Sequence, residues 1–189
     1  MNILVTGGAG YIGSITCVQL IAAGFRLVII DSLVNAKAAV LDRMEQVSGQ
    51  RPVFIEADVR DRARVVHVLR AYDINAVIHF AGLKAVGESV QQPLRYYENN
   101  LNSLINVLHY AQQYGVPHFV FSSSCSVYGQ PDALPVTELT PRKEAESPYA
   151  RTKQIGEDII HDFVKAHPAH KATLLRYFNP IGAHTSAQL

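Results

Sequence analysis

A tyrosine and a lysine four residues apart carry the most specific chemistry in the sequence. Ser147 and Pro148 are typical of the first positions of a helix, so Tyr149 and Lys153 are expected to lie one turn apart on one helix face. A lysine ammonium near a phenol favours the phenolate and is expected to lower its pKa from about 10 toward neutrality. The spacing therefore predicts that Tyr149 is a general base or acid. An exposed pair without a role is the alternative that the spacing leaves open.

A row of hydroxyl groups is predicted at the end of a strand. Ser122, Ser123 and Ser124 close an apolar strand-like run, and the carboxyl ends of strands are where ligands bind in α/β sheets. A serine hydroxyl there could hydrogen-bond a substrate oxygen, although serines also simply end strands. Cys125 follows without a histidine base in view, so we expect a small buried side chain rather than a nucleophile.

The N-terminal stretch predicts a dinucleotide site. An apolar run ends at Thr6, a glycine cluster ends at Gly13, and a helix-compatible run continues to Ala23. The glycines fit G-x-G-x-x-G beginning at Gly8 or G-x-x-G-x-x-G beginning at Gly7. In both readings the glycines allow a sharp turn, close approach of the backbone to a pyrophosphate, and close packing of helix on strand. The anion would then face the positive end of the helix dipole.

Three later strand ends complete the predicted cofactor site. Asp31 ends the second strand eighteen residues after Gly13. A carboxylate there can accept both hydroxyls of an adenine ribose and would repel a 2′-phosphate, which favours NAD over NADP; the alternative is that Asp31 only caps the next turn. Asp58-Val59 lies where an adenine ring is expected, with a plain helix-capping Asp as the alternative. The small residues of Phe80-Ala81-Gly82 suit either a cofactor shelf or an ordinary turn.

The elements that position these residues alternate between strand and helix. Continuous apolar runs rather than alternating ones favour a parallel sheet that is covered on both faces. The pattern predicts an α/β fold with a Rossmann-type doubly wound parallel sheet, with ligands at the carboxyl ends of the strands. Strands are predicted at Ile3–Thr6, Leu27–Ile30, Val53–Glu56, Ala76–Phe80, Phe119–Ser122 and Ala172–Tyr177, and helices at Tyr11–Ala23, Ala36–Ser48, Arg60–Tyr72, Pro93–Tyr114 and Pro148–Lys165.

Composition argues against several classes of partner. The chain has 189 residues, 48% of them hydrophobic, and a formal net charge of +1, so it lacks the basic surface that nucleic acids or membrane surfaces require. No apolar run approaches the roughly 20 residues of a membrane span, and no basic region precedes the N-terminal apolar run. Two cysteines are too few for a disulfide framework, which favours a soluble cytoplasmic protein. No metal site is predicted, because His167 and His170 are expected on the solvated surface and the other histidines form no ligand set.

Together these motifs resemble the extended short-chain dehydrogenase/reductase family. The resemblance rests on Thr6–Gly13, Asp58, the Ser124 strand end and Tyr149-x-x-x-Lys153. Within that family the chain is similar to the 4-epimerases of UDP-hexoses, and the run Leu83–Ser89 is specific to them. Further supporting stretches are His79–Gly82, Tyr96–Asn100, Ser122–Gly129 and Leu175–His184, whereas Ile15, Ser32, Ala150 and Thr152 depart from the usual residues.

The resemblance implies interconversion of UDP-glucose and UDP-galactose, a reaction of galactose metabolism, on tightly held NAD. Tyr149 would take the proton of the sugar 4′-hydroxyl while C4′ passes hydride to the nicotinamide, Ser124 would bridge the reacting oxygen, and Lys153 would hold the nicotinamide ribose. Substrate contacts are expected from Ser124, Tyr149 and Asn179. Cofactor contacts are expected from Gly7, Gly10, Tyr11, Ile12, Gly13, Asp31, Asn35, Asp58, Val59, Phe80, Ala81, Gly82, Lys84, Asn99, Tyr149, Lys153 and Tyr177.

The resemblance also implies a longer protein. The family has well over a hundred further residues, which carry most of the uridine-diphosphate pocket. We therefore expect residues 1–177 to form an NAD-binding Rossmann domain and residues 178–189 to begin a substrate-binding domain that is otherwise absent. A chain of this length is expected to lack epimerase activity and to expose an apolar patch near Phe178–Ile181.

A homodimer is the expected assembly of the full-length protein, through the fourth and fifth predicted helices. The stripe Leu101, Leu104, Ile105 and Leu108 has helical spacing and is assigned to the core of the domain. Residues nearer a partner are then Tyr97, His109 or Ile155.

Two alternatives to an epimerase follow from the sequence. A related nucleotide-sugar dehydratase or decarboxylase is one; a dehydratase would need an acidic pair where Cys125 and Ser126 stand, and these residues cannot supply it. The other is an NAD-binding module without turnover.

Overall fold

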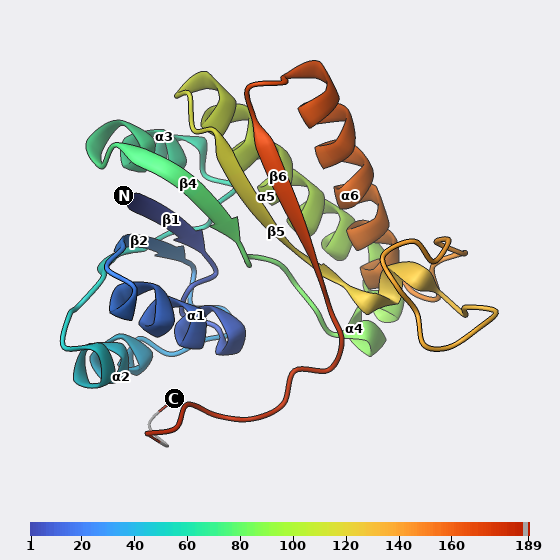
Figure 1. Ribbon diagram of the computed structural model, residues 1–189, viewed down its shortest axis with the longest axis horizontal. Helices are drawn as coiled ribbons and strands as arrows, with labels where there is room; N and C mark the ends of the chain where they lie inside the picture. Colours follow the sequence, from blue (N-terminus) through green and yellow to red (C-terminus); the bar gives the residue numbers. More distant parts are fainter. Residues whose placement is uncertain (187–188) are drawn as a thin grey trace.

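Six parallel strands form one sheet at the centre of the fold (Figure 1). The computed structural model describes residues 1–186 and 189. The strands are β1 (Asn2–Thr6), β2 (Arg26–Asp31), β3 (Val53–Glu56), β4 (Ile74–His79), β5 (His118–Ser124) and β6 (Lys171–Tyr177). Their order is β3-β2-β1-β4-β5-β6, and each neighbouring pair is parallel. The order reverses between β1 and β4, which is the place where doubly wound sheets bind their ligands.

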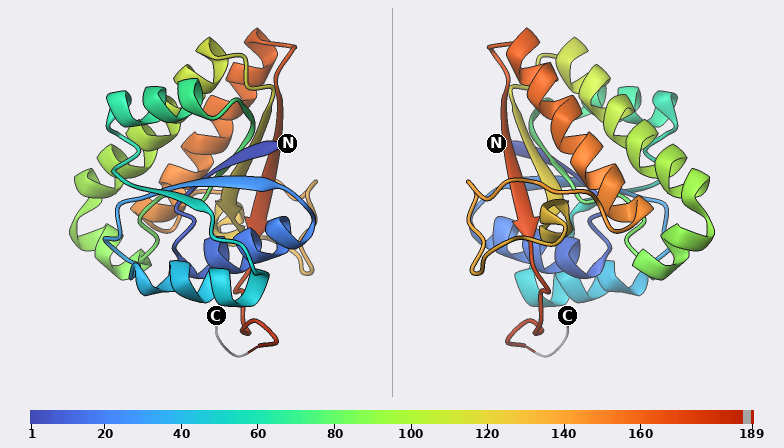
Figure 2. Two further views of the ribbon diagram at one scale, coloured as in Figure 1. Left: turned by 90° about the vertical axis from the view of Figure 1, so that its left-hand side faces the viewer. Right: turned by 90° about the vertical axis from the view of Figure 1, so that its right-hand side faces the viewer.

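Helices cover both faces of this sheet (Figure 2). They are α1 (Tyr11–Ala22), α2 (Ala39–Ser48), α3 (Arg62–Ala71), α4 (Val86–Gln91), α5 (Pro93–Gln113) and α6 (Pro148–Ala166), with a short 3₁₀ helix η1 (Cys125–Tyr128). One core cluster joins α1 and α2 to one face, with Val5, Cys17, Ile29 and Met44 fully buried. A second cluster joins α3, α5 and α6 to the other face around Leu4, Val77, Leu104 and Ile160.

The predicted doubly wound parallel sheet is confirmed, as are all of its predicted strands and the five predicted helices. Two elements were missed, α4 and η1, because six and four residues are too short to show a helical period. The second helix begins at Ala39 rather than Ala36, and β5 continues to Ser124 rather than ending at Ser122.

The helix start that positions the acid/base pair is built as predicted. Ser147 precedes α6 in an extended conformation, and its hydroxyl accepts a hydrogen bond from the Ala150 backbone N–H at 3.1 Å. Pro148 occupies the first turn, where its missing N–H is not needed. The starting point and rotation of α6 are thereby fixed beside the end of β5.

The apolar stripe on α5 divides between core and surface. Leu104 and Leu108 are buried and Leu101 is half-buried, as predicted. Ile105 is 48% exposed, so its assignment to the core was wrong. The stripe is wider than the contact with the sheet, and Ile105 lies on its outer edge beside exposed His109.

After β6 the chain leaves the sheet and runs past the α1 side of the molecule (Figure 1). The Tyr11 hydroxyl donates to the Gly182 carbonyl oxygen at 2.6 Å. Phe178 is 61% exposed and Ile181 93% exposed, which confirms the predicted exposure of this apolar segment. Of the helices in the described residues, none is long and apolar enough to cross a membrane.

Candidate active site

The glycine loop between β1 and α1 is packed too tightly for side chains. Gly7 has a φ of +71°, and a Cβ there would lie 2.6 Å from the backbone nitrogen of Ala81, two residues after β4. A Cβ on Gly13 would lie 2.5 Å from the Gly7 carbonyl oxygen. A side chain at Gly8 would press on Ile29 of β2. Gly8 thus lets the loop pack closely on β1 and β2, and Gly13 lets the first turn of α1 pack closely on the loop.

Asp31 joins this loop to the end of β2. Its Oδ2 accepts a hydrogen bond from the Ala9 backbone N–H at 3.0 Å, and its Oδ1 accepts one from the Leu33 backbone N–H at 2.9 Å. Turn capping, the alternative considered for this residue, therefore occurs. The carboxylate also lies directly beside the glycine loop, where the predicted ribose contact would require it. The ribose contact itself stays a prediction.

Asp58 is held by an arginine and does not cap a helix. Its carboxylate accepts hydrogen bonds from the Arg60 backbone N–H at 2.8 Å and from the Arg60 guanidinium at 2.6 Å. The hydrogen bond to Arg60 lowers the pKa of Asp58. The capping residue of α3 is Asp61, whose side chain accepts from Ala63 N–H and Arg64 N–H, so the capping alternative for Asp58 was wrong. Val59 beside it is buried, as a wall of an adenine pocket would be.

Tyr149, Lys153 and Ser124 come together where α6 packs against the end of β5. The Lys153 Nζ donates to the Ser122 carbonyl oxygen at 2.6 Å and lies 5.9 Å from the centroid of the Tyr149 ring. The same ammonium stacks over the ring of Phe121 at 4.8 Å. Burial lowers the pKa of Lys153 to about 8.

The direction predicted for the pKa of Tyr149 was wrong. Burial raises that pKa above its ordinary value of 10, and the hydrogen bond with Ser124 only partly counteracts the rise. Lys153 does not lower it, because the ammonium is directed to the carbonyl of Ser122 rather than to the phenol. In this structure the phenol of Tyr149 therefore keeps its proton at neutral pH.

The hydroxyl of Ser124 is oriented by the turn that follows it. Its Oγ accepts hydrogen bonds from the Ser126 backbone N–H at 3.2 Å and from the Ser126 hydroxyl at 2.9 Å. Because both contacts use its lone pairs, the Ser124 proton is free to point toward Tyr149. The sequence analysis assigned no such role to Ser126, although it lies in Ser122–Gly129, a run quoted for the family resemblance.

Asn100, another residue that was missed, fixes the segment after β4 against α6. Its side-chain oxygen accepts from Leu83 N–H at 2.8 Å, and its amide donates to Leu83 C=O at 3.0 Å and to the Thr152 hydroxyl at 3.1 Å. The neighbouring Asn99 donates to the Asn100 oxygen at 3.0 Å. Its place in Tyr96–Asn100, a run quoted for the family resemblance, was the available signal.

Of the remaining predicted site residues, most lie near the carboxyl ends of the strands, and two lie apart from them. Phe80, Ala81 and Gly82 follow β4 at the mouth of the site, and Tyr177 of β6 lies opposite Ser124 in the strand register. Burial raises the pKa of Tyr177. Gly10, Tyr11 and Ile12 lie at the start of α1, and Lys84 is exposed just beyond Leu83. Asn35 and Asn179 are exposed and lie outside the cluster around Tyr149.

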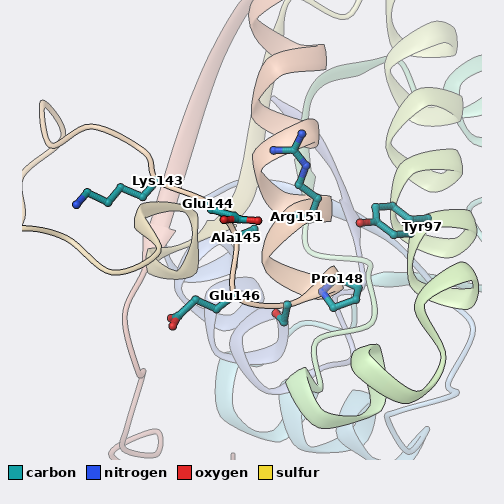
Figure 3. A pocket seen from close by; sticks show the side chains of 8 residues that line it. Tyr97, Lys143, Glu144, Ala145, Glu146, Pro148 and Arg151 are labelled. Atoms are coloured by element: carbon teal, nitrogen blue, oxygen red, sulfur yellow. The ribbon is translucent and has the colours of Figure 1, made fainter.

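A pocket of about 760 Å³ lies on another side of α6 (Figure 3). Figure 3 shows Tyr97 of α5 and Arg151 of α6 facing it, with the segment Lys143–Glu146 closing one end. None of the predicted cofactor or acid/base residues lines this pocket. Its lining mixes acidic and basic side chains, so it presents no single charge to a ligand.

Among the described residues, no group of three or more His, Cys, Asp or Glu side chains could hold a metal ion. His167 and His170 are half-buried rather than solvated, since both rings pack against Phe163 with centroids 4.9 and 5.3 Å away. The expectation of a solvated pair was therefore wrong. Cys125 is partly buried at the start of η1.

Comparison with known proteins places this geometry in context. A family model described as the NAD dependent epimerase/dehydratase family matches residues 3–188. The chain is 49% identical over 192 residues to UDP-glucose 4-epimerase uge1 of Schizosaccharomyces pombe, covering 100% of this chain and 54% of that protein. It is 49% identical over 189 residues to UDP-glucose 4-epimerase of Bacillus subtilis, covering 100% of this chain and 56% of that protein.

Solved structures of UDP-glucose 4-epimerases are also similar to this chain. The fold matches UDP-glucose 4-epimerase of Bifidobacterium longum in complex with NAD⁺ and UDP, with a TM-score of 0.99 and 43% identity, over 100% of this chain and 56% of that one. It also matches the Stenotrophomonas maltophila enzyme with bound NAD and formylated UDP-arabinopyranose, with a TM-score of 0.97 and 46% identity over 100% and 56% of the two chains. The chain thus spans about half the length of the relatives it matches.

Proposed function

Because the chain belongs to the NAD dependent epimerase/dehydratase family, we propose that it binds NAD and serves in the C4 epimerisation of UDP-hexoses, interconverting UDP-glucose and UDP-galactose. One observation carries the proposal. The carboxyl ends of β1, β4 and β5 bring the glycine loop, the small residues after His79, and the group Ser124–Tyr149–Lys153 to one edge of the sheet. A dinucleotide and a proton-transferring group would meet there.

The residues present fit a dinucleotide. The cradle between Gly7 and Gly13 has no room for a Cβ, which suits close approach of a pyrophosphate to backbone N–H groups. Among the described residues, no side chain caps α1, and its first turn contains no acidic residue. The positive end of the α1 dipole is therefore open to an anion. Asp31 lies beside the loop as an acceptor for ribose hydroxyls, and Asp58 and Val59 would border the adenine.

The chain's own residues supply proton transfer and orientation. When bound, NAD supplies reversible acceptance of a hydride from the sugar carbon. Tyr149 would exchange a proton at its Oη with the sugar 4′-hydroxyl, and Ser124, held by the turn after β5, would donate to the same oxygen. Lys153 is a cation on the same helix face, placed to contact the nicotinamide ribose and to favour the phenolate when the phenol approaches it.

Further contacts are proposed on the basis of the family. Lys84, Asn99 and Tyr177 would complete the cofactor site, and Asn179 would contact the phosphates of the nucleotide sugar. Residues 1–177 are proposed as the NAD-binding domain and residues 178–189 as the start of the substrate-binding region; β6 ends at Tyr177, and the chain then becomes exposed. Cys125 and Ser126 open η1, and neither supplies the carboxylic acid that a dehydratase needs at these positions.

A homodimer through α5 and α6 is also proposed. Ile105 and His109 present exposed surface on α5, while Tyr97 and Ile155 are half-buried beside it. An apolar side chain exposed on a helix pair of this kind would gain burial against a second copy.

Two measurements test the function. The purified protein is denatured, and the released nucleotide is assayed enzymatically for NAD and NADP; we expect NAD, and finding NADP would overturn the assignment of Asp31. Conversion of UDP-galactose to UDP-glucose is then followed by chromatography in the protein at the length that its gene encodes. NAD binding together with a lack of conversion there would favour the module without turnover.

A further inference from the structure

A buried ion pair lies directly behind the proposed acid/base group. The Glu157 side chain is only 3% exposed, and its two oxygens accept hydrogen bonds from Arg176 Nε at 2.9 Å and Arg176 Nη2 at 2.8 Å. Glu157 follows Lys153 by four residues on α6, and Arg176 precedes Tyr177 on β6. Hydrogen bonds to Glu157 and to Tyr128 raise the pKa of the Arg176 guanidinium, so this residue stays charged.

The pair also connects the elements that carry the site. The Ser123 hydroxyl, next to Ser124 on β5, donates to Glu157 Oε1 at 2.5 Å. Arg176 Nη1 donates to the Tyr128 hydroxyl of η1 at 3.0 Å, and the guanidinium stacks on the Tyr128 ring at 4.9 Å. A single carboxylate therefore links α6, β5 and β6, and through Arg176 it reaches η1.

The surroundings of Lys153 explain what this carboxylate can do. On β5 the ammonium meets the Ser122 carbonyl and the face of Phe121. On β4 it faces His79, whose pKa burial lowers to about 3, so that ring is neutral. On its own helix it has the protonated phenol of Tyr149 and the carboxylate of Glu157. Of these neighbours, only Glu157 carries negative charge at neutral pH.

We propose that Glu157 is a positioning residue, which keeps the buried Lys153 side chain positively charged and holds α6 in register with β5 and β6. A buried ion pair is weak evidence for stability by itself, because removing two charges from water offsets much of their attraction. Because Glu157 lies one helix turn from Lys153, its charge can act on the Lys153 ammonium in addition to any effect on stability. The inference rests on the proposed function only in the role assigned to Lys153 toward NAD.

The sign of the expected effect follows from the charges. Burial lowers the pKa of Lys153 to about 8, and the negative charge of Glu157 opposes that fall. Without this charge the pKa of Lys153 should fall further, by about one unit for a negative charge one helix turn away. At pH 7.5 the charged fraction of Lys153 would drop from about three quarters to about one quarter.

The test is a titration of Lys153 by NMR in protein labelled at lysine ¹³Cε, with the signal assigned by Lys153→Arg. The variant is Glu157→Gln. Its matched control is Asp162→Asn, the same kind of change at an exposed residue of α6. Asp158 is unsuitable, because its partner Arg142 also lies 3.6 Å from Glu157 Oε2. We expect wild type to titrate near 8, Glu157→Gln about one unit lower, and Asp162→Asn as wild type.

Because Glu157→Gln leaves Arg176 unpaired and could prevent folding, the double variant Glu157→Gln/Arg176→Gln is titrated as well. It removes the stranded charge and is also expected to lower the pKa of Lys153. An unchanged titration in either folded variant overturns the proposal. So does a wild-type Lys153 that titrates below about 7, since the ammonium would then not be maintained.

The affinity for NAD at pH 7.5 separates this inference from the proposed function. If the ammonium form of Lys153 contacts NAD, Glu157→Gln should weaken binding about threefold, in line with the charged fraction. A shifted titration with unchanged NAD affinity would support the role of Glu157 and reject the role of Lys153 toward the cofactor. An unchanged titration would reject the role of Glu157 whatever the NAD affinity, and weakened binding would then come from a change other than the charge of Lys153.

Discussion

Replacing Asp31 by alanine separates a cofactor role from a structural one. The carboxylate makes two backbone hydrogen bonds, to Ala9 N–H and Leu33 N–H, so Asp31→Ala must affect stability whether or not NAD binds. Each such bond contributes about 0.5–1.5 kcal/mol, which gives a loss of about 1–3 kcal/mol in the free energy of unfolding. For a chain of this size that corresponds to a fall in Tm of about 2–12 °C.

The cofactor role predicts a second, independent loss. A hydrogen bond from a ribose hydroxyl to a carboxylate contributes about 1.5–3 kcal/mol, so Asp31→Ala should weaken NAD binding about 10- to 150-fold. NADP binding should weaken less or improve, because the repulsion of its 2′-phosphate is removed. Isothermal titration calorimetry with both nucleotides, performed well below Tm, measures the ratio of the two dissociation constants.

Asp61→Ala supplies the matched control. Asp61 also accepts two backbone hydrogen bonds, from Ala63 and Arg64 at the start of α3, but it lies outside the predicted cofactor site. It should lower Tm by a similar amount and leave the preference for NAD over NADP unchanged. If Asp31→Ala behaved in the same way as this control, Asp31 would be a capping residue only, and the argument for NAD from its carboxylate would be refuted.

Three further predictions test the site, the core and the assembly. In the protein at the length its gene encodes, Tyr149→Phe should reduce turnover of UDP-galactose by about 10²–10⁴ and leave binding of the nucleotide sugar intact; near-normal turnover would assign proton transfer to another group. Burial lowers the pKa of His79 from 6.5 to about 3, so below pH 6.5 the unfolded chain binds a proton that the folded chain does not. Stability should then fall with falling pH, by up to about 1.4 kcal/mol per pH unit, and urea unfolding of His79→Gln between pH 7.5 and 4.5 should show a weaker fall. Ile105→Arg should convert the proposed dimer into a monomer in size-exclusion chromatography with light scattering, and a wild-type monomer at full length would reject the dimer.

Prediction from the sequence succeeded best at positions where the fold tolerates only a few residue types. The cradle of Gly7 and Gly13 excludes any Cβ, and continuous apolar runs are required of strands that are buried on both faces. These signals predicted the glycine loop, the order of the elements and the family, all of which the structure and the relatives confirm. Short α4 and η1 have no such requirement, and both were missed.

Residues that act through a partner distant in the sequence were the hardest to predict. Asn100 acts through Leu83 and Thr152, and Glu157 through Ser123 and Arg176. A buried glutamate or asparagine looks like a surface residue until its partners are placed beside it, and those partners lie on other elements. Only the packing of α5 and α6 on the sheet brings them within hydrogen-bonding distance.

The pair Tyr149–Lys153 shows what a local sequence pattern can predict and what it cannot. Spacing by four places both side chains on one face of α6, as the structure has them. The pattern does not specify what that face packs against. Desolvation favours the neutral form of each group, so burial raises the pKa of Tyr149 and lowers that of Lys153 to about 8. The Lys153 ammonium donates its hydrogen bond to the Ser122 carbonyl oxygen rather than to the phenol. The sequence thus identifies the groups that can exchange a proton, whereas the packing of α6 on β5 decides in which direction each pKa moves.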